Sequence, residues 1–123
     1  MPDPRPQLDT TDGVVRVIGV RCTECGYPVA FARLRCPVCR GPVETERFGP
    51  DGVVWSATTV RIPVGDREPP YQLAYVDLQD GPRILAHVAG PDGAPASDVV
   101  PVGARVRLRG RNDAGDAVVE VLA

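Results

Sequence analysis

Two closely spaced pairs of cysteines are the most specific chemistry that the sequence carries. The pairs lie at Cys22–Cys25 and Cys36–Cys39, in a C-x2-C-x10-C-x2-C array. This spacing suits a tetrahedral metal site with four thiolate ligands. Each pair should form a tight turn that directs backbone N–H groups at the thiolates, and Gly26 and Gly41 follow the turns where a left-handed backbone conformation is expected. The predicted metal ligands are Cys22, Cys25, Cys36 and Cys39.

Three kinds of cysteine site fit this array. Structural zinc is the preferred interpretation, because four thiolates close the coordination sphere and leave no position for a reactive water. Such a site contributes on the order of 10 kcal/mol to folding. Iron is the alternative, since Cys22–Tyr27 and Cys36–Cys39 look like the two knuckles of rubredoxin, although only ten residues separate the pairs and the chain has few aromatics. Redox disulfide chemistry would require an exposed pair with a lowered pKa.

Four arginines alternate along one segment, at Arg105, Arg107, Arg109 and Arg111. A period of two places them on one face of a strand. They would form a positive stripe for phosphate groups, or simply the solvated outer face of a barrel.

Binding of single-stranded nucleic acid is an alternative function, because it uses aromatic side chains stacked beside basic ones. The candidates for stacking are Trp55, Tyr71 and Tyr75. Acidic residues outnumber basic ones, 16 to 14, and the net charge is −2. The composition therefore argues against a nucleic-acid partner.

No catalytic constellation stands out in the sequence. His87 is the only histidine and lies inside a strand-like segment, where a structural role is the simpler interpretation. The charged segment from Arg61 to Tyr71 is either a docking loop or an ordinary barrel loop.

The elements that must position these residues read as short strands between Gly- and Pro-rich turns. No segment has a helical period. Residues 1–13 read as a flexible arm, 14–48 as a small all-β metal module of the zinc-ribbon kind, and 49–123 as a barrel with strands at 53–62, 71–78, 83–89, 106–109 and 117–122. The predicted fold class is all-β, a rubredoxin-like zinc ribbon followed by a five-stranded OB-fold barrel, with an SH3-like barrel as the rival. The predicted barrel core is Val54, Val60, Leu73, Val76, Leu78, Ile84, Leu85, Val88, Val106, Leu108, Val119 and Val121.

The cellular setting is predicted from what the sequence lacks. It has no run of eighteen apolar residues, and its first residues lack the order of a signal peptide. We therefore expect a cytoplasmic protein without a membrane partner, in a compartment where paired thiols bind metal more often than they form disulfides.

In the order of its motifs and the residues within them, the chain resembles the zinc-ribbon plus OB-fold acyl-CoA-associated proteins, the domain of unknown function thirty-five family. The resemblance covers residues 20–110. It lies in the cysteine array, followed by the segments 52–61, 69–71, 74–86 and 101–106.

The resemblance implies a small non-catalytic subunit. Members bind a thiolase-like or lipid-transfer-protein-like enzyme that handles acyl-CoA, by thiolysis, retro-aldol cleavage or acyl condensation, and can complete its CoA channel. Their cysteines hold structural zinc, a role that the four cysteines here inherit by position. No motif fixes a residue that contacts CoA. The candidates for contact with the partner or CoA are Trp55, Arg61, Arg67, Pro69, Pro70, Tyr71 and Arg83.

Overall fold

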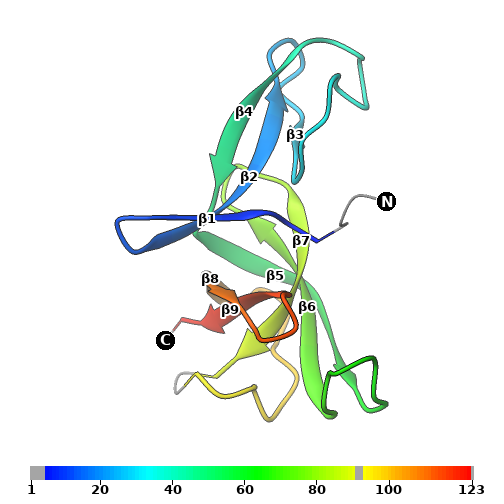
Figure 1. Ribbon diagram of the computed structural model, residues 1–123, viewed down its shortest axis with the longest axis vertical. Helices are drawn as coiled ribbons and strands as arrows, with labels where there is room; N and C mark the ends of the chain where they lie inside the picture. Colours follow the sequence, from blue (N-terminus) through cyan, green and yellow to red (C-terminus); the bar gives the residue numbers. More distant parts are fainter. Residues whose placement is uncertain (1–4, 91–92, 123) are drawn as a thin grey trace.

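The computed structural model describes residues 5–90 and 93–122. These residues form strands, turns and loops, and none of them is helical (Figure 1). No helix long and apolar enough to cross a membrane occurs in this part of the chain. The strands are β1 (Leu8–Thr11), β2 (Val14–Cys22), β3 (Pro28–Val29), β4 (Val43–Phe48), β5 (Asp51–Val60), β6 (Tyr71–Leu78), β7 (Arg83–Ala89), β8 (Arg105–Arg111) and β9 (Ala117–Val121).

The first four strands form the sheet of the ribbon, with β2 at its centre. On one side β2 pairs first with β1 and then with β3, and on the other side with β4, and every pairing is antiparallel. The expectation of a flexible arm is wrong for Leu8–Thr11, which are strand β1. Asp12 and Gly13 both have positive φ, 54° and 76°, as a tight two-residue hairpin requires. The part of the predicted arm at residues 1–4 lies outside the described residues.

The last five strands form a closed barrel in the order β5-β6-β7-β9-β8. Closure requires β7 and β9 to pair in parallel, at His87–Ala89 and Val118–Glu120, and β5 to pair with β8. This is the five-stranded Greek-key arrangement of an OB-fold, as the sequence predicts. All five predicted barrel strands are present: β6 and β7 have the predicted boundaries, and those of β5, β8 and β9 differ by one or two residues.

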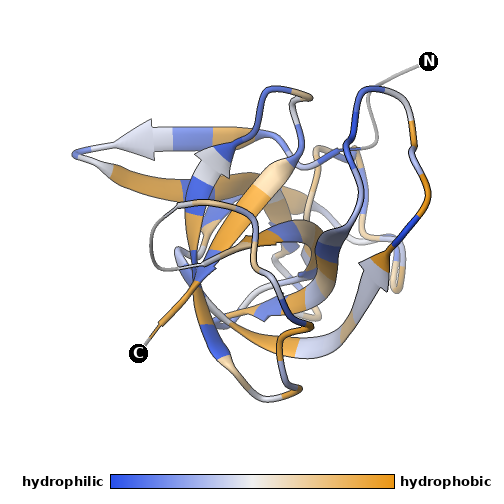
Figure 2. Ribbon diagram, turned by 90° about the horizontal axis from the view of Figure 1, so that it is seen from below, coloured by the Kyte–Doolittle hydropathy of each residue, from blue (hydrophilic) through white to orange (hydrophobic). Residues whose placement is uncertain are grey.

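The core of the barrel comes from the alternating inward positions of its strands. In Figure 2 these strands surround the core and alternate between hydrophobic and hydrophilic residues. Eight of the twelve predicted core residues are buried, whereas Val60, Leu73 and Val121 are half-buried. The prediction is wrong for Leu85, whose side chain is 45% exposed because it lies between the inward Ile84 and Ala86 and so points outward.

The ribbon and the barrel share one hydrophobic core. Val15, Val17 and Phe48 of the ribbon belong to the same buried cluster as the barrel residues. Phe48 packs so closely on the turn after β6 that a Cβ atom at Gly81 would lie 2.8 Å from its ring. The side chain of Arg21 lies over the Phe48 ring and donates to the carbonyl oxygen of Asp80. These contacts fix the ribbon against one end of the barrel.

Candidate functional site

The two cysteine pairs converge at one point of the ribbon. All four Sγ atoms lie within 4.8 Å of one another. The Sγ–Sγ distance is 3.4 Å from Cys22 to Cys39 and 3.6 Å from Cys25 to Cys36. A tetrahedral site with Zn–S bonds of about 2.3 Å has sulfur atoms about 3.8 Å apart. The cluster therefore has the size of a four-thiolate metal site, as the spacing predicts.

Backbone N–H groups point at the sulfurs, as expected for metal-binding turns. The N–H groups of Glu24 and Cys25 donate to Cys22 Sγ at 3.4 and 3.3 Å. Gly26 has the expected positive φ of 79°. In the second turn it is Arg40 that adopts a positive φ, 63°, and not Gly41. A Cβ atom at Gly41 would lie 2.7 Å from a carboxylate oxygen of the exposed Glu24 side chain, which would have to move, and 3.2 Å from Cys39 Sγ.

The electrostatics of the four thiols favours a cation among them. The N–H of Cys25 donates to Cys22 Sγ and is the largest cause lowering the pKa of that thiol to about 6. The pKa of Cys39 is raised to about 12, because the effect of the Gly41 N–H is outweighed by the neighbouring Cys22 sulfur, burial and the other two sulfurs. Four thiols this close cannot all ionise unless a positive charge lies among them. A metal ion would supply that charge, and the four sulfurs would close its coordination sphere.

Two of the predicted contact residues, Trp55 and Arg83, meet on the outer face of the barrel. Trp55 lies where the register of β5 shifts against β6, and its side chain is 50% exposed. The Arg83 guanidinium lies 3.7 Å from the centre of the Trp55 ring and also donates to Asp77 at 2.6 Å. Tyr75 meets the Trp55 ring edge-on, with centroids 6.3 Å apart. We call Trp55, Tyr75, Arg83 and the neighbouring Leu85 the aromatic face.

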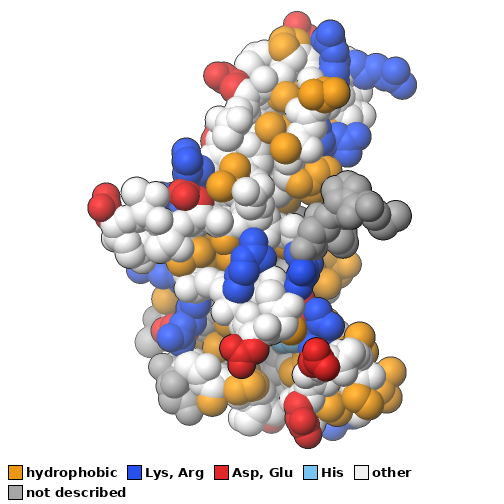
Figure 3. All heavy atoms as spheres, in the orientation of Figure 1, with side chains coloured by type: hydrophobic (Ala, Val, Ile, Leu, Met, Phe, Trp, Pro, Cys, Tyr) orange, Lys and Arg blue, Asp and Glu red, His pale blue; other side chains and the backbone are white. Residues whose placement is uncertain are grey.

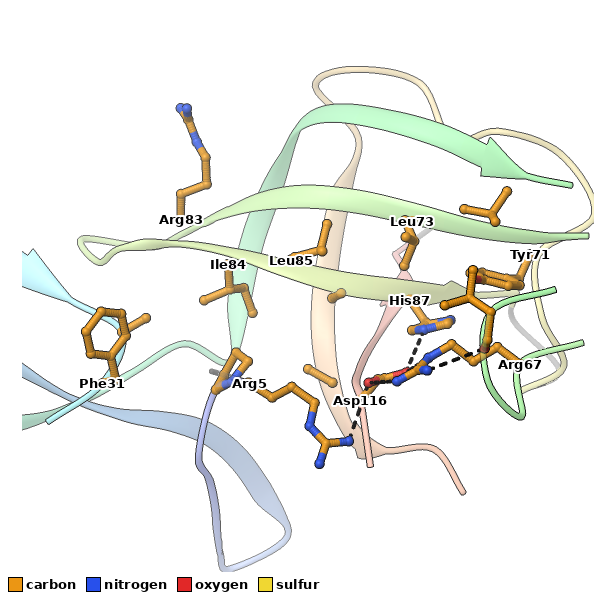
Figure 4. A pocket seen from close by; sticks show the side chains of 16 residues that line it. Arg5, Phe31, Arg67, Tyr71, Leu73, Arg83, Ile84, Leu85, His87 and Asp116 are labelled. Atoms are coloured by element: carbon orange, nitrogen blue, oxygen red, sulfur yellow. Dashed lines mark hydrogen bonds and ion pairs between the residues drawn. The ribbon is translucent and has the colours of Figure 1, made fainter. Parts of the chain in front are cut away.

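Two other predicted contact residues, Arg67 and Tyr71, belong to a second cluster centred on Asp116 (Figure 4). Arg67 donates to both oxygens of Asp116, at 2.6 and 2.8 Å. His87 Nε2 lies 3.0 Å from the same carboxylate and its ring stacks on Tyr71. The Arg67 hydrogen bond is the largest cause lowering the pKa of Asp116 to about 2.

The Asp116 cluster lies at one end of a cavity of about 530 Å³. The cavity walls are mainly aliphatic side chains of β6 and β7, together with Phe31 of the ribbon and Arg5. Sequence reasoning missed Asp116, because its partners Arg67 and His87 are far away along the chain and no motif links them. It also missed Phe31 and Arg5.

Arg61, Pro69 and Pro70 lie between β5 and β6, apart from these clusters. Arg61 and Pro70 are exposed and Pro69 is half-buried. The side chain of Arg61 makes no hydrogen bond or ion pair with any described residue. The structure thus brings together only part of the predicted contact set.

The arginine stripe on β8 is exposed, as predicted, but most of it is paired. Arg107 bonds Asp51 at 2.8 Å and Arg109 pairs with Glu120 at 2.9 Å. Arg111 donates to the backbone oxygens of Gly115 and Pro6. These pairings favour the interpretation as a solvated barrel face.

Comparison with known proteins agrees with this architecture. The family described as "ChsH2, C-terminal OB-fold domain" matches residues 45–111, more than half of the chain. The chain belongs to the DUF35 family, the domain of unknown function thirty-five.

Among its relatives are proteins named as DUF35 domain-containing scaffold proteins. The one from Methanocaldococcus jannaschii is 33% identical over 76 residues, which are 58% of this chain and 54% of the relative. The one from Methanothermobacter thermautotrophicus is 30% identical over 88 residues, which are 67% of this chain and 66% of the relative. The match thus spans between about half and two thirds of the length of these relatives.

Solved structures with the same fold include a complex described as the Ltp2-ChsH2(DUF35) aldolase. It superposes with a TM-score of 0.67 at 24% identity, over 86% of this chain and 84% of that chain. A DUF35 protein of unknown function from Sulfolobus solfataricus superposes with a TM-score of 0.62 at 20% identity, over 87% of this chain and 76% of that one. At these identities the likeness establishes the fold.

Proposed function

We propose that this protein is a non-catalytic accessory subunit of a thiolase-like or lipid-transfer-protein-like enzyme that acts on acyl-CoA. The observation that carries the proposal is membership of the DUF35 family, whose relatives are named as scaffold proteins. A fold neighbour from an aldolase complex points to the same kind of assembly. In this role the subunit braces its partner and forms part of the wall of the CoA channel, while the reaction is thiolysis, retro-aldol cleavage or acyl condensation. We place this assembly in the cytoplasm.

The aromatic face supports binding to a protein partner. It presents exposed Trp, Tyr and Arg side chains, the types that contribute most to binding at protein interfaces. Arg83 is held by Asp77 and Trp55, which limits the side-chain entropy lost on binding. Among the predicted contact residues, Trp55 and Arg83 are therefore the strongest candidates.

The metal in the cysteine cluster is proposed to be structural zinc. Four thiolates are the donor set of structural zinc sites, and the cluster has the matching size. Zinc would fix the two turns and supply free energy of folding to a sheet with few buried residues of its own. Elemental analysis of the purified protein should find zinc; bound iron would instead support the rubredoxin-like alternative.

Co-expression with a candidate thiolase-like enzyme from the same genome tests the accessory role. The two proteins should elute together in size-exclusion chromatography, and the enzyme should lose activity or stability without this subunit. Separate elution, with full activity of the enzyme alone, would overturn the proposal. Trp55→Ala should weaken the complex, whereas Arg105→Ala, on the β8 face of the barrel, is the matched control.

Binding of single-stranded nucleic acid is the second candidate, because the aromatic face carries two exposed rings beside an arginine. The pairing of Arg83 with Asp77 and the net charge of −2 argue against it. A titration with a short single-stranded RNA at low salt distinguishes the candidates, since nucleic-acid binding weakens steeply as salt is added. Binding of the RNA in place of the enzyme would support the second candidate.

A further inference from the structure

Along one half of strand β7, no other described strand pairs with β7 on one side. Strand β9 pairs with β7 only from His87 to Ala89. The preceding residues, Arg83 to Ala86, pair with β6 alone. The barrel is therefore closed at one end of β7 and leaves an open edge of four residues at the other.

Hydrogen bonds at both ends of β7 show which backbone groups lie on this open edge. On the β6 side, the N–H of Leu78 donates to Pro82 O. At the other end of β7, on the same side, the N–H of Ala96 donates to Val88 O. Because backbone groups alternate along an antiparallel strand, the even-numbered residues of β7 face β6. The N–H and C=O groups of Arg83 and Leu85 therefore face the open edge, and no described segment bonds to them.

The open edge lies in a groove between the barrel and the ribbon. The cavity of about 530 Å³ follows Arg83–Ala86 on one side and has Phe31 and Arg5 on the other (Figure 4). A second cavity, of about 540 Å³, continues from Arg83 between Tyr27–Phe31 of the ribbon and the turn after β6. The groove is thus long enough for several residues of an extended chain.

The polarity and charge of the groove indicate which kind of chain segment it binds. Its walls are mainly apolar, from Ile84, Leu85 and Phe31. Its charged side chains are Arg5, Arg33, Arg67 and Arg83 against Asp77 and Asp116, an excess of positive charge. Natural sheets protect open edges with charges or proline. Here the one charge on the edge, Arg83, is folded onto Trp55 and Asp77. The backbone N–H and C=O groups on this edge of β7 are therefore available to pair with another strand.

The ribbon surface beside the groove is also basic and apolar. Phe31, Leu34 and Val38 are 48%, 96% and 64% exposed. Arg33, Arg35 and Arg40 are exposed beside them, and Figure 3 shows hydrophobic and arginine side chains together over the ribbon. The positive charge of the groove therefore continues onto the ribbon.

We propose that an extended, acidic segment of the partner enzyme adds as a strand to the Arg83–Ala86 edge of β7. Its backbone pairs with the N–H and C=O groups of Arg83 and Leu85, as in other cases of strand addition. An apolar side chain of the segment enters the cavity and an acidic one faces Arg5 and Arg67. The identity of the partner rests on the proposed function; the edge, its polarity and its charge do not.

Amide hydrogen exchange of the ¹⁵N-labelled protein tests the proposal residue by residue. In the free chain the amides of Ile84 and Ala86 should exchange slowly and those of Arg83 and Leu85 rapidly. In the complex with the thiolase-like enzyme the last two should slow by about tenfold or more, as buried hydrogen bonds do. A complex in which Arg83 and Leu85 still exchange rapidly would overturn the proposal and leave the accessory role intact. Failure to form any complex would overturn both.

A second copy of this chain is the competing occupant. It would appear as slow exchange of Arg83 and Leu85 in the absence of the enzyme, together with a dimer mass in light scattering, and would also overturn the proposal.

Two proline variants distinguish the contribution of backbone hydrogen bonds to partner binding from that of the side chain. Leu85→Pro removes only an outward N–H and should fold, because proline is tolerated on the free side of an edge strand. It should bind the enzyme at least about tenfold more weakly than Leu85→Ala, which keeps the N–H. Ala86→Pro removes a bond to β6 and should unfold the barrel. Equal affinity of Leu85→Pro and Leu85→Ala would refute strand addition; if Leu85→Pro does not fold, the exchange experiment decides.

Discussion

Replacing Asp116 with asparagine would keep the size of the side chain and remove the charge that holds the second cluster together. The carboxylate accepts two hydrogen bonds from Arg67 and one contact from His87, and Arg5 Nη1 lies 3.6 Å away. The Asp116 side chain is only 14% exposed and that of Arg67 28%. Asp116→Asn therefore leaves a largely buried guanidinium without its counter-ion.

The magnitude follows from the pKa of Asp116. This pKa is lowered from 3.8 to about 2, chiefly by Arg67. At about 1.4 kcal/mol per pKa unit, the charged carboxylate contributes about 2.5 kcal/mol to stability at neutral pH. At a shift in melting temperature of about 4 °C per kcal/mol for a chain of this size, Asp116→Asn should melt about 10 °C lower. Because the folded pKa is lowered, this contribution is full above pH 3.8 and disappears as the pH falls toward 2.

Urea unfolding at a series of pH values is the assay, with Asp77→Asn as the matched control. Asp77 also binds an arginine through two oxygens, but its side chain is 45% exposed, so this pair should contribute less than about 1 kcal/mol. The difference in free energy of unfolding between wild type and Asp116→Asn should persist from pH 8 to pH 5. A loss of unfolding free energy no larger than that caused by Asp77→Asn, or one that disappears near neutral pH, would refute the reasoning.

Three further substitutions test the metal centre, the aromatic face and the junction of the two modules. Cys36→Ser should abolish metal binding and collapse the chemical-shift dispersion of the ribbon resonances in an NMR spectrum while the barrel resonances stay dispersed; metal retained at the wild-type ratio by elemental analysis would contradict a four-thiolate site. Trp55→Ala should weaken binding to the enzyme about thirtyfold, about 2 kcal/mol, with an unchanged melting temperature, and calorimetry with Arg105→Ala as the control measures it. Gly81→Ala should destabilise the chain by about 1–3 kcal/mol in urea unfolding, because the new methyl group would meet the buried Phe48 ring at 2.8 Å; wild-type stability would mean that the ring moves without cost.

The fold was predictable because its signals are local. Gly- and Pro-rich turns bound each barrel strand, and the β-branched alternation between them is that of half-buried strands. Strand β1 was missed although Asp12-Gly13 is a hairpin signal, because the surrounding residues are polar and proline-rich and resemble an arm. The cysteine cluster was predictable for the same reason, since each pair is a local turn.

The second cluster was not predictable, because it depends on contacts between distant parts of the chain. Arg67 and Asp116 are 49 residues apart, and they meet only because β7 and β9 pair in parallel and close the barrel. The outward orientation of Leu85 depends in the same way on the register between β6 and β7. A shift of one residue would bury Leu85 and expose Ile84.

The position of Phe31 links the cysteine cluster to the groove along β7. Phe31 lies in the loop between the two cysteine pairs and forms the ribbon wall of both cavities. Of that loop, only Pro28–Val29 pairs with β2, so its remaining residues depend on the two turns at the cysteines for their position. A metal that fixes these turns therefore also fixes the wall facing Arg83–Ala86. On this reasoning a metal at the four cysteines supports partner binding indirectly, because it fixes one wall of the groove in which we propose that the partner segment binds.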